Sequence, residues 1–565
     1  MTDDMRFWRR PPTVRRDYFD GRFGQVHFRI ARPAGAGQVP LLFIHSSPSS
    51  GRMWQALLAE LGQDRIAVAA DTPGFGDSAV PLEPPEIADY AANAGDVLDH
   101  LGIARADVMG YHTGSKVSVE LALQRPALVR RLVLVSAPVY TAEELARQKT
   151  DYAAHDIARD GGHLRARWRF MMQWRKPDVP LTVFQRSLAD SLKGGDTAWW
   201  GHRAAFRYHH ADNLPAVSQP VLVLNTDDDL VVPTARVPAF LQNGRMVDCP
   251  DWSHASQDIH TGAYARLIRD FLDEPADDSR PRAVAKPVPP RPGATQPQPI
   301  RRRFLDGPTG QLHLRIAGEV GAGDGTAGAV PLFLFHMSPN SGRIWETIQA
   351  EMARDRLVVA VDTPGFGESD APAEPPEIAD YARTMVHVAA APGLRRIDVM
   401  GYHTGSLTAV ETALQRPDLV RKVVMVSAPF YTDAERAARH ARNQPTVVQD
   451  DGAHLSDRFA ALWQFYGADV PAAVVARNFC ESLRGGPLSW WGHRAAFNYD
   501  LAGRLPGVAQ EILLLNPNDD LAIQTPRALP LMQRGRQHDF PRYSHGMLDT
   551  HTAEIAAVLR GFLSH

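Results

Sequence analysis

The stretch that decides the fold is VMGYHTGS, which runs from Val108 to Ser115 and returns letter for letter from Val399 to Ser406. In it an apolar run ends at Gly110, and Gly114 follows at the start of a segment with helical spacing. Small residues at these two places predict a tight strand-to-helix turn, because such a turn leaves no room for side chains beside its centre. The central residue of the turn projects upward from the sheet, and here it is His112.

Other stretches return at the same spacing. DTPGFGDS begins at Asp71 and DTPGFGES at Asp362, while WWGHRAAF begins at both Trp199 and Trp490. In every case the two copies are 291 positions apart. A constant offset over so long a distance indicates two copies of one domain of about 270 residues, an ordinary size for a single domain.

The repeat sets the predicted domain boundaries. We predict a first domain over 1–273 and a second over 304–565, joined by an extended, proline-rich linker over 274–303. Within each copy a long segment, about 139–216 and about 430–507, is rich in large apolar residues and lacks β-branched runs. These segments predict a helical lid above each sheet.

The remaining apolar runs alternate with segments of helical spacing, as parallel strands alternate with crossover helices. In the first copy we predict buried strands at 39–45, 65–71, 106–111, 129–138 and 220–225. The fold class is therefore α/β, with a mostly parallel, doubly wound sheet in each of two tandem domains.

Composition excludes several functions. The formal net charge of −3 gives no argument for nucleic acid, and no stretch approaches the roughly 18 apolar residues of a membrane span. We therefore expect a cytoplasmic protein that binds neither nucleic acid nor membrane. Cys249 and Cys480 fall at non-matching places in the two copies and predict packing residues, not a disulfide or a thiolate metal site. No cofactor is expected.

Four motifs in order resemble the α/β-hydrolase superfamily, in its epoxide-hydrolase and haloalkane-dehalogenase branch, over nearly all of both copies. HSSPSSGRMW, from His45, is similar to the loop after the third strand, with Pro48 and Trp54 at matching spacing. GYHTG stands at the nucleophile turn, NTDDDLVVP resembles the loop that carries the acid, and DWSHAS resembles the loop that carries the catalytic histidine.

The resemblance implies a site in each copy. Its catalytic positions are His112, Asp229 and His254 in the first copy and His403, Asp520 and His545 in the second. The oxyanion hole would be formed by backbone amides of Ser47 and Thr113, and of Ser338 and Thr404. The sequence departs from the family where the usual glycine after the loop histidine is Ser46 or Met337, and above all where histidine replaces the nucleophile.

Histidine at this place leaves four alternatives open. The carboxylate and the second histidine form a general base in any case. His112 could attack an acyl carbon directly, since a helix N-terminus disfavours the imidazolium. It could instead act with His254 as an acid–base pair in a hydrolase or a lyase. A metal held by both histidines and Asp229 is the third alternative, which we set aside because the aspartate should face the back of its histidine. The fourth is a catalytically inactive domain that binds a ligand.

Neighbouring polar residues receive structural interpretations. Asp227 and Asp228 are expected to shape a turn, because acidic clusters in loops commonly do. Ser115 and Ser406 should cap the helix after the turn. The recurring His163 and His454 suit a helix start as well as a substrate contact.

The lids carry the substrate prediction. Three of their positions recur in both copies and are assigned to substrate binding: Trp199, His202 and Arg203 in the first copy, and Trp490, His493 and Arg494 in the second. An aromatic wall with one guanidinium suits a mostly apolar small molecule with a carboxylate or carbonyl. The alternative is a packed lid helix in which the arginine pairs with an acid.

We therefore predict a hydrolase of an ester, lactone or carbon–carbon bond, with a lyase or an inactive ligand-binding protein as alternatives. We also expect the two domains to pair within the chain, and a homo-oligomer stays open.

Overall fold

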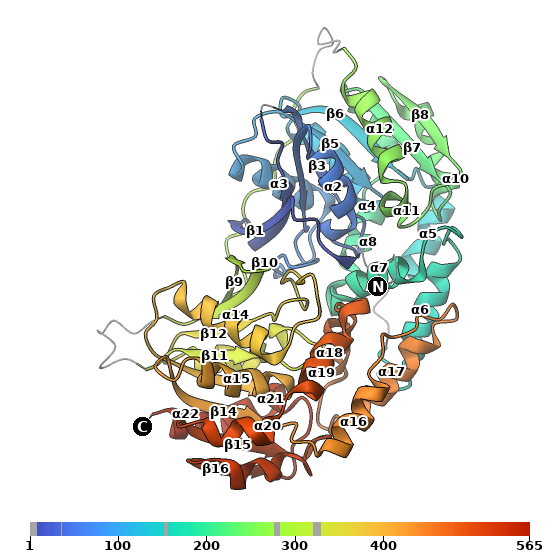
Figure 1. Cartoon of the computed structure of the whole chain (residues 1–565). Coiled ribbons are helices and arrows are strands. Elements are labelled where there is room, and N and C mark those ends of the chain that lie inside the picture. The colour runs from blue at the N-terminus through green and yellow to red at the C-terminus, as the bar shows by residue number, and fades with distance from the viewer. Residues whose placement is uncertain (1–7, 36, 152–155, 276–282, 320–328, 565) are drawn as a thin grey trace. The chain divides into compact units, whose positions relative to one another are not determined.

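The computed structural model describes residues 8–564 apart from 36, 152–155, 276–282 and 320–328 (Figure 1). Met1–Asp156 and Ala166–Pro297 form one compact unit, and Ile157–Arg165 and Gln298–His565 form a second. We call these units the first and the second domain.

In the described part of the first domain, eight strands form one sheet in the order β1-β2-β4-β3-β5-β6-β7-β8. β2 pairs antiparallel with β1 and β4, and all other neighbours pair parallel. The strands are β1 (Val14–Gly21), β2 (Gly24–Ala31), β3 (Gln38–Ile44), β4 (Arg65–Ala70), β5 (Ala106–Tyr111), β6 (Val129–Val135), β7 (Val221–Thr226) and β8 (Gly244–Cys249).

The second domain repeats this sheet in the order β16-β15-β14-β13-β11-β12-β10-β9. Here β10 is the strand that pairs antiparallel with both neighbours. The strands are β9 (Ile300–Gly307), β10 (Gly310–Ala317), β11 (Leu332–Phe335), β12 (Val358–Val361), β13 (Ile397–Tyr402), β14 (Val420–Val426), β15 (Glu511–Pro517) and β16 (Gly535–Phe540).

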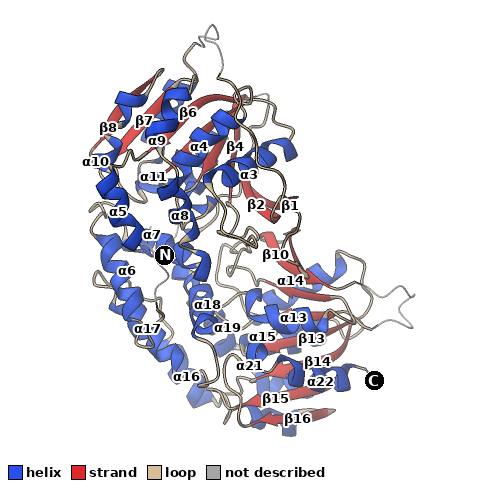
Figure 2. Ribbon diagram, turned by 180° about the vertical axis from the view of Figure 1, so that it is seen from behind, coloured by secondary structure: helices blue, strands red, loops and turns tan. Residues whose placement is uncertain are grey.

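Helices lie on both faces of each sheet (Figure 2). Those of the first domain are α2 (Gln55–Leu61), α3 (Ile87–His100), α4 (Thr113–Gln124), α5 (Ala142–Asp151), α6 (Gly162–Met172), α7 (Leu181–Leu192), α8 (Trp200–Arg207), α9 (His210–Asn213), α10 (Val231–Thr234), α11 (Ser256–Ile259) and α12 (Thr261–Leu272). Those of the second are α13 (Glu346–Met352), α14 (Ile378–Ala390), α15 (Thr404–Gln415), α16 (Asp433–Arg442), α17 (Ala453–Trp463), α18 (Ala472–Leu483), α19 (Trp490–Asn498), α20 (Leu501–Arg504), α21 (Met547–Thr550) and α22 (Thr552–Leu563). Short 3-10 turns are η1 (Gly51–Trp54), η2 (Gly195–Thr197), η3 (Leu214–Ala216), η4 (Val237–Phe240), η5 (Gly342–Trp345), η6 (Gly486–Leu488), η7 (Leu505–Gly507) and η8 (Thr525–Leu531).

The central strands are buried on both faces, which explains why they read as continuous apolar runs. In the first domain, Leu42 and Val108 belong to the core cluster that includes α3 and α4. Their sequence neighbours Leu41 and Met109 point to the opposite face and belong to the cluster that includes α2 and α12. The predicted fold class, two tandem domains with mostly parallel and doubly wound sheets, is confirmed.

Some elements differ from the prediction. The hairpin β1–β2 and the edge strand β8 have no counterpart among the predicted strands, because their alternating or polar sequences lack a continuous apolar run. β9 begins at Ile300, so the end of the predicted linker is part of the second sheet. Earlier in that linker, the backbone of Lys286 donates to the carbonyl of Leu123, 2.8 Å away, and this contact holds it against the first domain.

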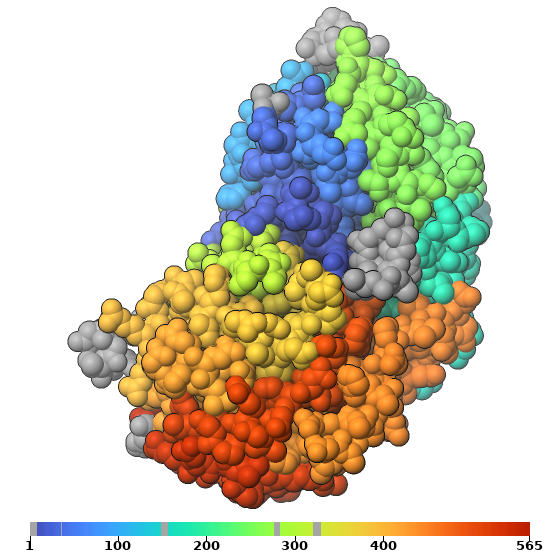
Figure 3. Space-filling model, viewed as in Figure 1, coloured from blue at the N-terminus to red at the C-terminus, as the bar shows by residue number. Residues whose placement is uncertain are grey.

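Helices α5–α9 lie between β6 and β7, and helices α16–α20 lie between β14 and β15, where the lids were predicted. Figure 3 shows lid residues at the surface, teal in the first domain and orange in the second. Among the described residues, no helix combines the length and apolar character that a membrane crossing requires.

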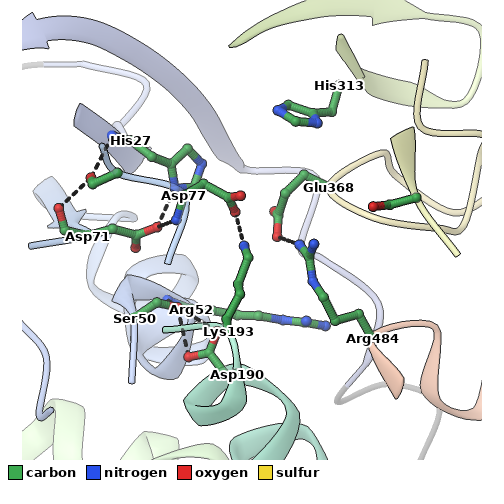
Figure 4. Close-up of polar contacts among 12 residues, drawn as sticks. His27, Ser50, Arg52, Asp71, Asp77, Asp190, Lys193, His313, Glu368 and Arg484 are labelled. Atoms are coloured by element: carbon green, nitrogen blue, oxygen red, sulfur yellow. Dashed lines mark hydrogen bonds and ion pairs between the residues drawn. The ribbon is translucent and has the colours of Figure 1, made fainter. Parts of the chain in front are cut away.

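A buried ion pair fixes each lid to its core (Figure 4). In the first domain Lys193, at the end of α7, binds Asp77 in the loop after β4, and both side chains are almost fully buried. In the second domain Arg484 binds Glu368 at the corresponding positions. The charges are kept while both residues change, so the cation–carboxylate contact itself matters for attaching the lid.

Candidate active site

His112 occupies the turn between β5 and α4. Its φ and ψ angles are 50° and −112°, and those of His403 are 48° and −116°, a strained backbone region for any residue but glycine. A Cβ atom on Gly110 would lie 2.1 Å from the carbonyl oxygen of Gly114, and one on Gly114 would lie 2.3 Å from that of Ile44. The turn therefore needs both glycines, as the sequence pattern predicts.

Two histidine–carboxylate pairs meet at this turn in the first domain. Nε2 of His112 lies 3.1 Å from Oδ2 of Asp228, and Nε2 of His254 lies 3.0 Å from Oδ1 of Asp229. The ring centres of the histidines are 5.4 Å apart. The structure thus brings together the three residues that the resemblance selects and adds a fourth, Asp228.

The assignment of Asp228 as a turn residue is incomplete. Its side chain is fully buried, and three hydroxyl groups donate to its Oδ2, those of Tyr111 at 2.9 Å, Ser136 at 2.7 Å and Thr226 at 2.8 Å. The backbone amide of Leu230 donates to Oδ1. A carboxylate held by so many donors is a fixed anion behind the turn, and its recurrence in both copies was the available signal.

Asp227, its neighbour, matches the structural interpretation. Its carboxylate lies 2.6 Å from the ammonium of Lys176, and both side chains reach solvent. The corresponding residue in the second copy is Asn518. Asp227 therefore lies outside the cluster at the turn.

Tyr111 is a member of the cluster that was not predicted. Besides its bond to Asp228, its hydroxyl lies 3.3 Å from Nδ1 of His254, so it connects the two pairs. Tyr402 lies 3.4 Å from Nδ1 of His545 in the same way. The tyrosine precedes the histidine of the turn in both copies, but a buried strand residue gives no sequence signal for this role.

The second domain has the same arrangement. Nε2 of His403 lies 3.2 Å from Asp519, Nε2 of His545 lies 3.0 Å from Asp520, and the rings are 5.2 Å apart. Ser427 donates to Asp519 as Ser136 does to Asp228. Two copies of one network argue against an accidental contact.

Burial and charge act in opposite directions on the cluster. Burial by itself would raise the pKa of Asp228, but the adjacent His112 holds that pKa well below its usual value. Burial by itself would lower the pKa of His254, and the hydrogen bond and charge of Asp229 raise it above the usual value. The pKa of His403 is raised against burial by Asp520 and Asp519. The carboxylates therefore stay ionised and stabilise an imidazolium.

The predicted oxyanion-hole residues lie beside the turn. Ser47 follows β3, Thr113 is the first residue of α4, and both line the cavity that contains His112. In the second domain Thr404 begins α15, and Ser338 packs against Gly492 of the lid helix α19. Their role as amide donors stays a prediction.

The lid residues separate into two groups. His202 lines the cavity, and burial lowers its pKa to about 3, as burial lowers that of His493 to about 4. Arg203 instead pairs with Glu86 at 3.0 Å, and Trp199 is outside the cavity lining. In the second domain Arg494 pairs with Glu377, 2.8 Å away, and Trp490 begins α19. The arginines thus follow the alternative interpretation, a lid helix paired with an acid.

The remaining polar residues have structural partners. Ser115 donates to the carbonyl of His112, 2.6 Å away, and Ser406 to that of Gly401, 2.9 Å away. The rings of His163 and His454 accept backbone hydrogens at the starts of α6 and α17. Both cysteines are buried and neither forms a disulfide.

The four charged side chains of each site could be considered as metal ligands, because their ligand atoms lie within 4.8 Å of one another. Oδ2 of Asp228 already accepts from three hydroxyl groups and from His112. No lone pair is left there for a cation. The donor set therefore fits hydrogen-bonded pairs better than a metal centre.

Sequence comparison agrees with this architecture. The family model described as the alpha/beta hydrolase fold matches residues 39–261 and 330–468. The chain belongs to the alpha/beta hydrolase fold family. Both domains contribute to the match, as the internal repeat requires.

Individual relatives match parts of this chain. A 2-hydroxymuconate semialdehyde hydrolase of Pseudomonas sp. (strain CF600) is 36% identical over 263 residues, 43% of this chain and 89% of its own length. An uncharacterized protein of Mycobacterium tuberculosis is 36% identical over 129 residues, 22% of this chain and only 36% of that protein's length. The enol-lactonase of Burkholderia xenovorans LB400 is similar in structure, with 20% identity and a TM-score of 0.40, over 46% of this chain and all of its own.

Proposed function

We propose that each domain hydrolyses an ester, a lactone or a carbon–carbon bond of a small, mostly apolar molecule by acid–base catalysis. The observation that carries the proposal is that each imidazole has a carboxylate of its own, His112 with Asp228 and His254 with Asp229. The relationship to a 2-hydroxymuconate semialdehyde hydrolase supports a hydrolytic reaction.

In this mechanism His254 is the general base. Its Nε2 hydrogen binds Asp229, and its Nδ1 exchanges the 3.3 Å contact with the Tyr111 hydroxyl for a water, from which it takes a proton as that water attacks the substrate carbonyl. Asp229 stabilises the imidazolium that forms. The backbone amides of Ser47 and Thr113 would hold the oxygen that becomes negative.

In this mechanism His112 is the general acid that protonates the leaving group. Its Nε2 is held by Asp228, so Nδ1 is the ring atom left for the substrate. In this proposal His112 starts with a proton on each ring nitrogen, opposite the Asp228 carboxylate; the Nδ1 proton passes to the leaving oxygen or carbon, and the proton gained by His254 then replaces it. The same geometry argues against covalent catalysis, because the far nitrogen of the ring, the one that would reach a bound acyl group, is already committed.

The test is a panel of activated esters, lactones and diketones incubated with the full chain, with products and intact protein mass recorded. We expect turnover without a lasting adduct, and at least about a hundredfold loss when His254→Ala and His545→Ala are combined. An adduct on His112 or His403 would replace acid–base catalysis by a covalent route. Elimination products would indicate a lyase, and binding without turnover an inactive ligand-binding protein.

Three expectations stay predictions: the cytoplasmic location, the pairing of the two domains within the chain, and activity without a cofactor.

A further inference from the structure

The cavity of the first domain contains a cation that the mechanism does not use. Lys116 lies in α4, four residues after His112, and lines the same cavity. Its ammonium donates to the carbonyls of Ala205, at 2.7 Å, and Tyr208, at 2.8 Å. An ammonium has three hydrogens, so one donor is left for the cavity.

No acidic side chain among the described residues pairs with Lys116. Burial lowers the pKa of its amine to about 7, and no carboxylate opposes that effect. A buried amine without a counter-ion is costly, so its presence needs a reason. The ammonium lies over the ring of Tyr140, 5.2 Å from its centre.

The second domain lacks this lysine but keeps a cation beside the same ring. Leu407 occupies the position of Lys116. Tyr431 corresponds to Tyr140, and the guanidinium of Arg439 lies 4.4 Å from its centre. Arg439 comes from the lid helix α16, at the position where the first domain has Gln148.

Lys116 and Arg439 therefore place a positive charge beside the corresponding tyrosine ring in the two domains, each from a different helix. Gln148 lines the cavity of the first domain, which locates that lid position at the site. In the second domain Arg439 is close enough for its charge to act on His493 and Asp520. Among the described acids none pairs with Arg439. If Lys116 only filled space, Leu407 could replace it in the second domain with no further change. If Lys116 binds a negatively charged ligand, the second domain needs a cation from another position, and Arg439 provides one.

We propose that each site binds a substrate with an anionic group, such as a carboxylate, through Lys116 in the cavity of the first domain and through Arg439, beside Tyr431, in the second. Arg203 and Arg494 have a different charge partner, because each pairs with a glutamate, whereas Lys116 and Arg439 have none among the described acids. The inference deepens the proposed function, since it names the substrate class of the same site.

The test compares 4-phenylbutyrate with 4-phenylbutyramide, which differ in charge but hardly in shape, by calorimetric titration of the full chain. We expect the carboxylate to bind two sites per chain. Lys116→Leu and Arg439→Gln, each taken from the other domain, should weaken one site each by about ten- to a hundredfold, while amide binding stays unchanged. Far-ultraviolet circular dichroism checks folding.

The matched control returns a positive charge to the first domain from the lid position that carries it in the second domain. Adding Gln148→Arg to Lys116→Leu gives the first domain the arrangement of the second and should recover carboxylate binding. Equal binding of acid and amide, unchanged carboxylate binding in the Lys116→Leu/Arg439→Gln chain, or no carboxylate binding to the unmodified chain up to about 10 mM would overturn the inference. Because binding is measured without turnover, a protein that binds the acid but hydrolyses nothing would refute the proposed function alone.

Discussion

Replacing Asp228 and Asp519 by asparagine removes the charge behind both turns while nearly keeping the shape of the side chains. The lost interaction is a charge-assisted hydrogen bond of 3.1 Å in the first domain and 3.2 Å in the second. Such a bond contributes about 1.5–3 kcal/mol, which corresponds to about 10- to 150-fold in rate. Loss of control over the imidazole tautomer adds to this effect, so we expect kcat to fall at least about 100-fold with little change in KM.

The assay is steady-state hydrolysis of the best ester or lactone from the panel. Asp227→Asn is the matched control, because that aspartate forms a partly exposed pair with Lys176 and asparagine already stands there in the second copy. The control should keep its activity. Activity within threefold of the unmodified chain in the Asp228→Asn/Asp519→Asn variant would show that these carboxylates only support the loop.

A second readout does not depend on turnover. Asp519 and Asp520 raise the pKa of His403 against the effect of burial. Asp519→Asn should therefore lower that pKa, which nitrogen-15 NMR of the imidazole can follow. An unchanged titration of His403 would contradict the electrostatic coupling on which the mechanism depends.

Three further predictions concern lid attachment, pH and the turn. Lys193→Met removes the cation that binds the buried Asp77, so the free energy of unfolding of the first domain should fall by about 3–5 kcal/mol in urea titrations; a loss below about 1 kcal/mol would mean that the pair does not fix the lid. The pKa of Asp71 is depressed, against burial, by His27, so its contribution to stability is complete above about pH 5 and is lost as the pH falls below about 4. Asp71→Asn should reduce the fall in melting temperature below about pH 4, measured in thermal melts at successive pH values. An unchanged fall would mean that other groups cause the loss of stability in acid. His112→Ser with His403→Ser should give an acyl adduct on the introduced serine with an activated ester, detectable by intact mass; its absence would mean that the amide donors are misplaced.

Much of the fold is readable along the chain because its information is local. The central strands are buried on both faces and therefore appear as continuous apolar runs, of which 106–111 coincides with β5. The hairpin β1–β2 escapes this reasoning, since its exposed side carries charged residues and only sheet pairing makes it regular.

The site residues that lie in family motifs were predictable from the sequence. His112, Asp229 and His254 are named by their motifs, and the structure brings them together. Arg203 was assigned to the substrate because it recurs, but its partner Glu86 lies more than a hundred positions away in sequence. Recurrence in two copies does not distinguish a packing contact from a binding contact.

The sequence by itself determined the duplication, the alternation of strands and helices, and the strained turn that carries a histidine, because each depends on spacing or on the size of neighbouring residues. Only the tertiary structure showed that Asp228, the neighbour of the predicted Asp229, holds the second histidine, His112. Successive residues of one loop point in different directions: Asp227 reaches solvent, Asp228 turns under the strand ends and Asp229 faces the cavity. That division depends on hydroxyl groups at the ends of β5 and β7 and just after β6, which become neighbours only when the sheet has formed.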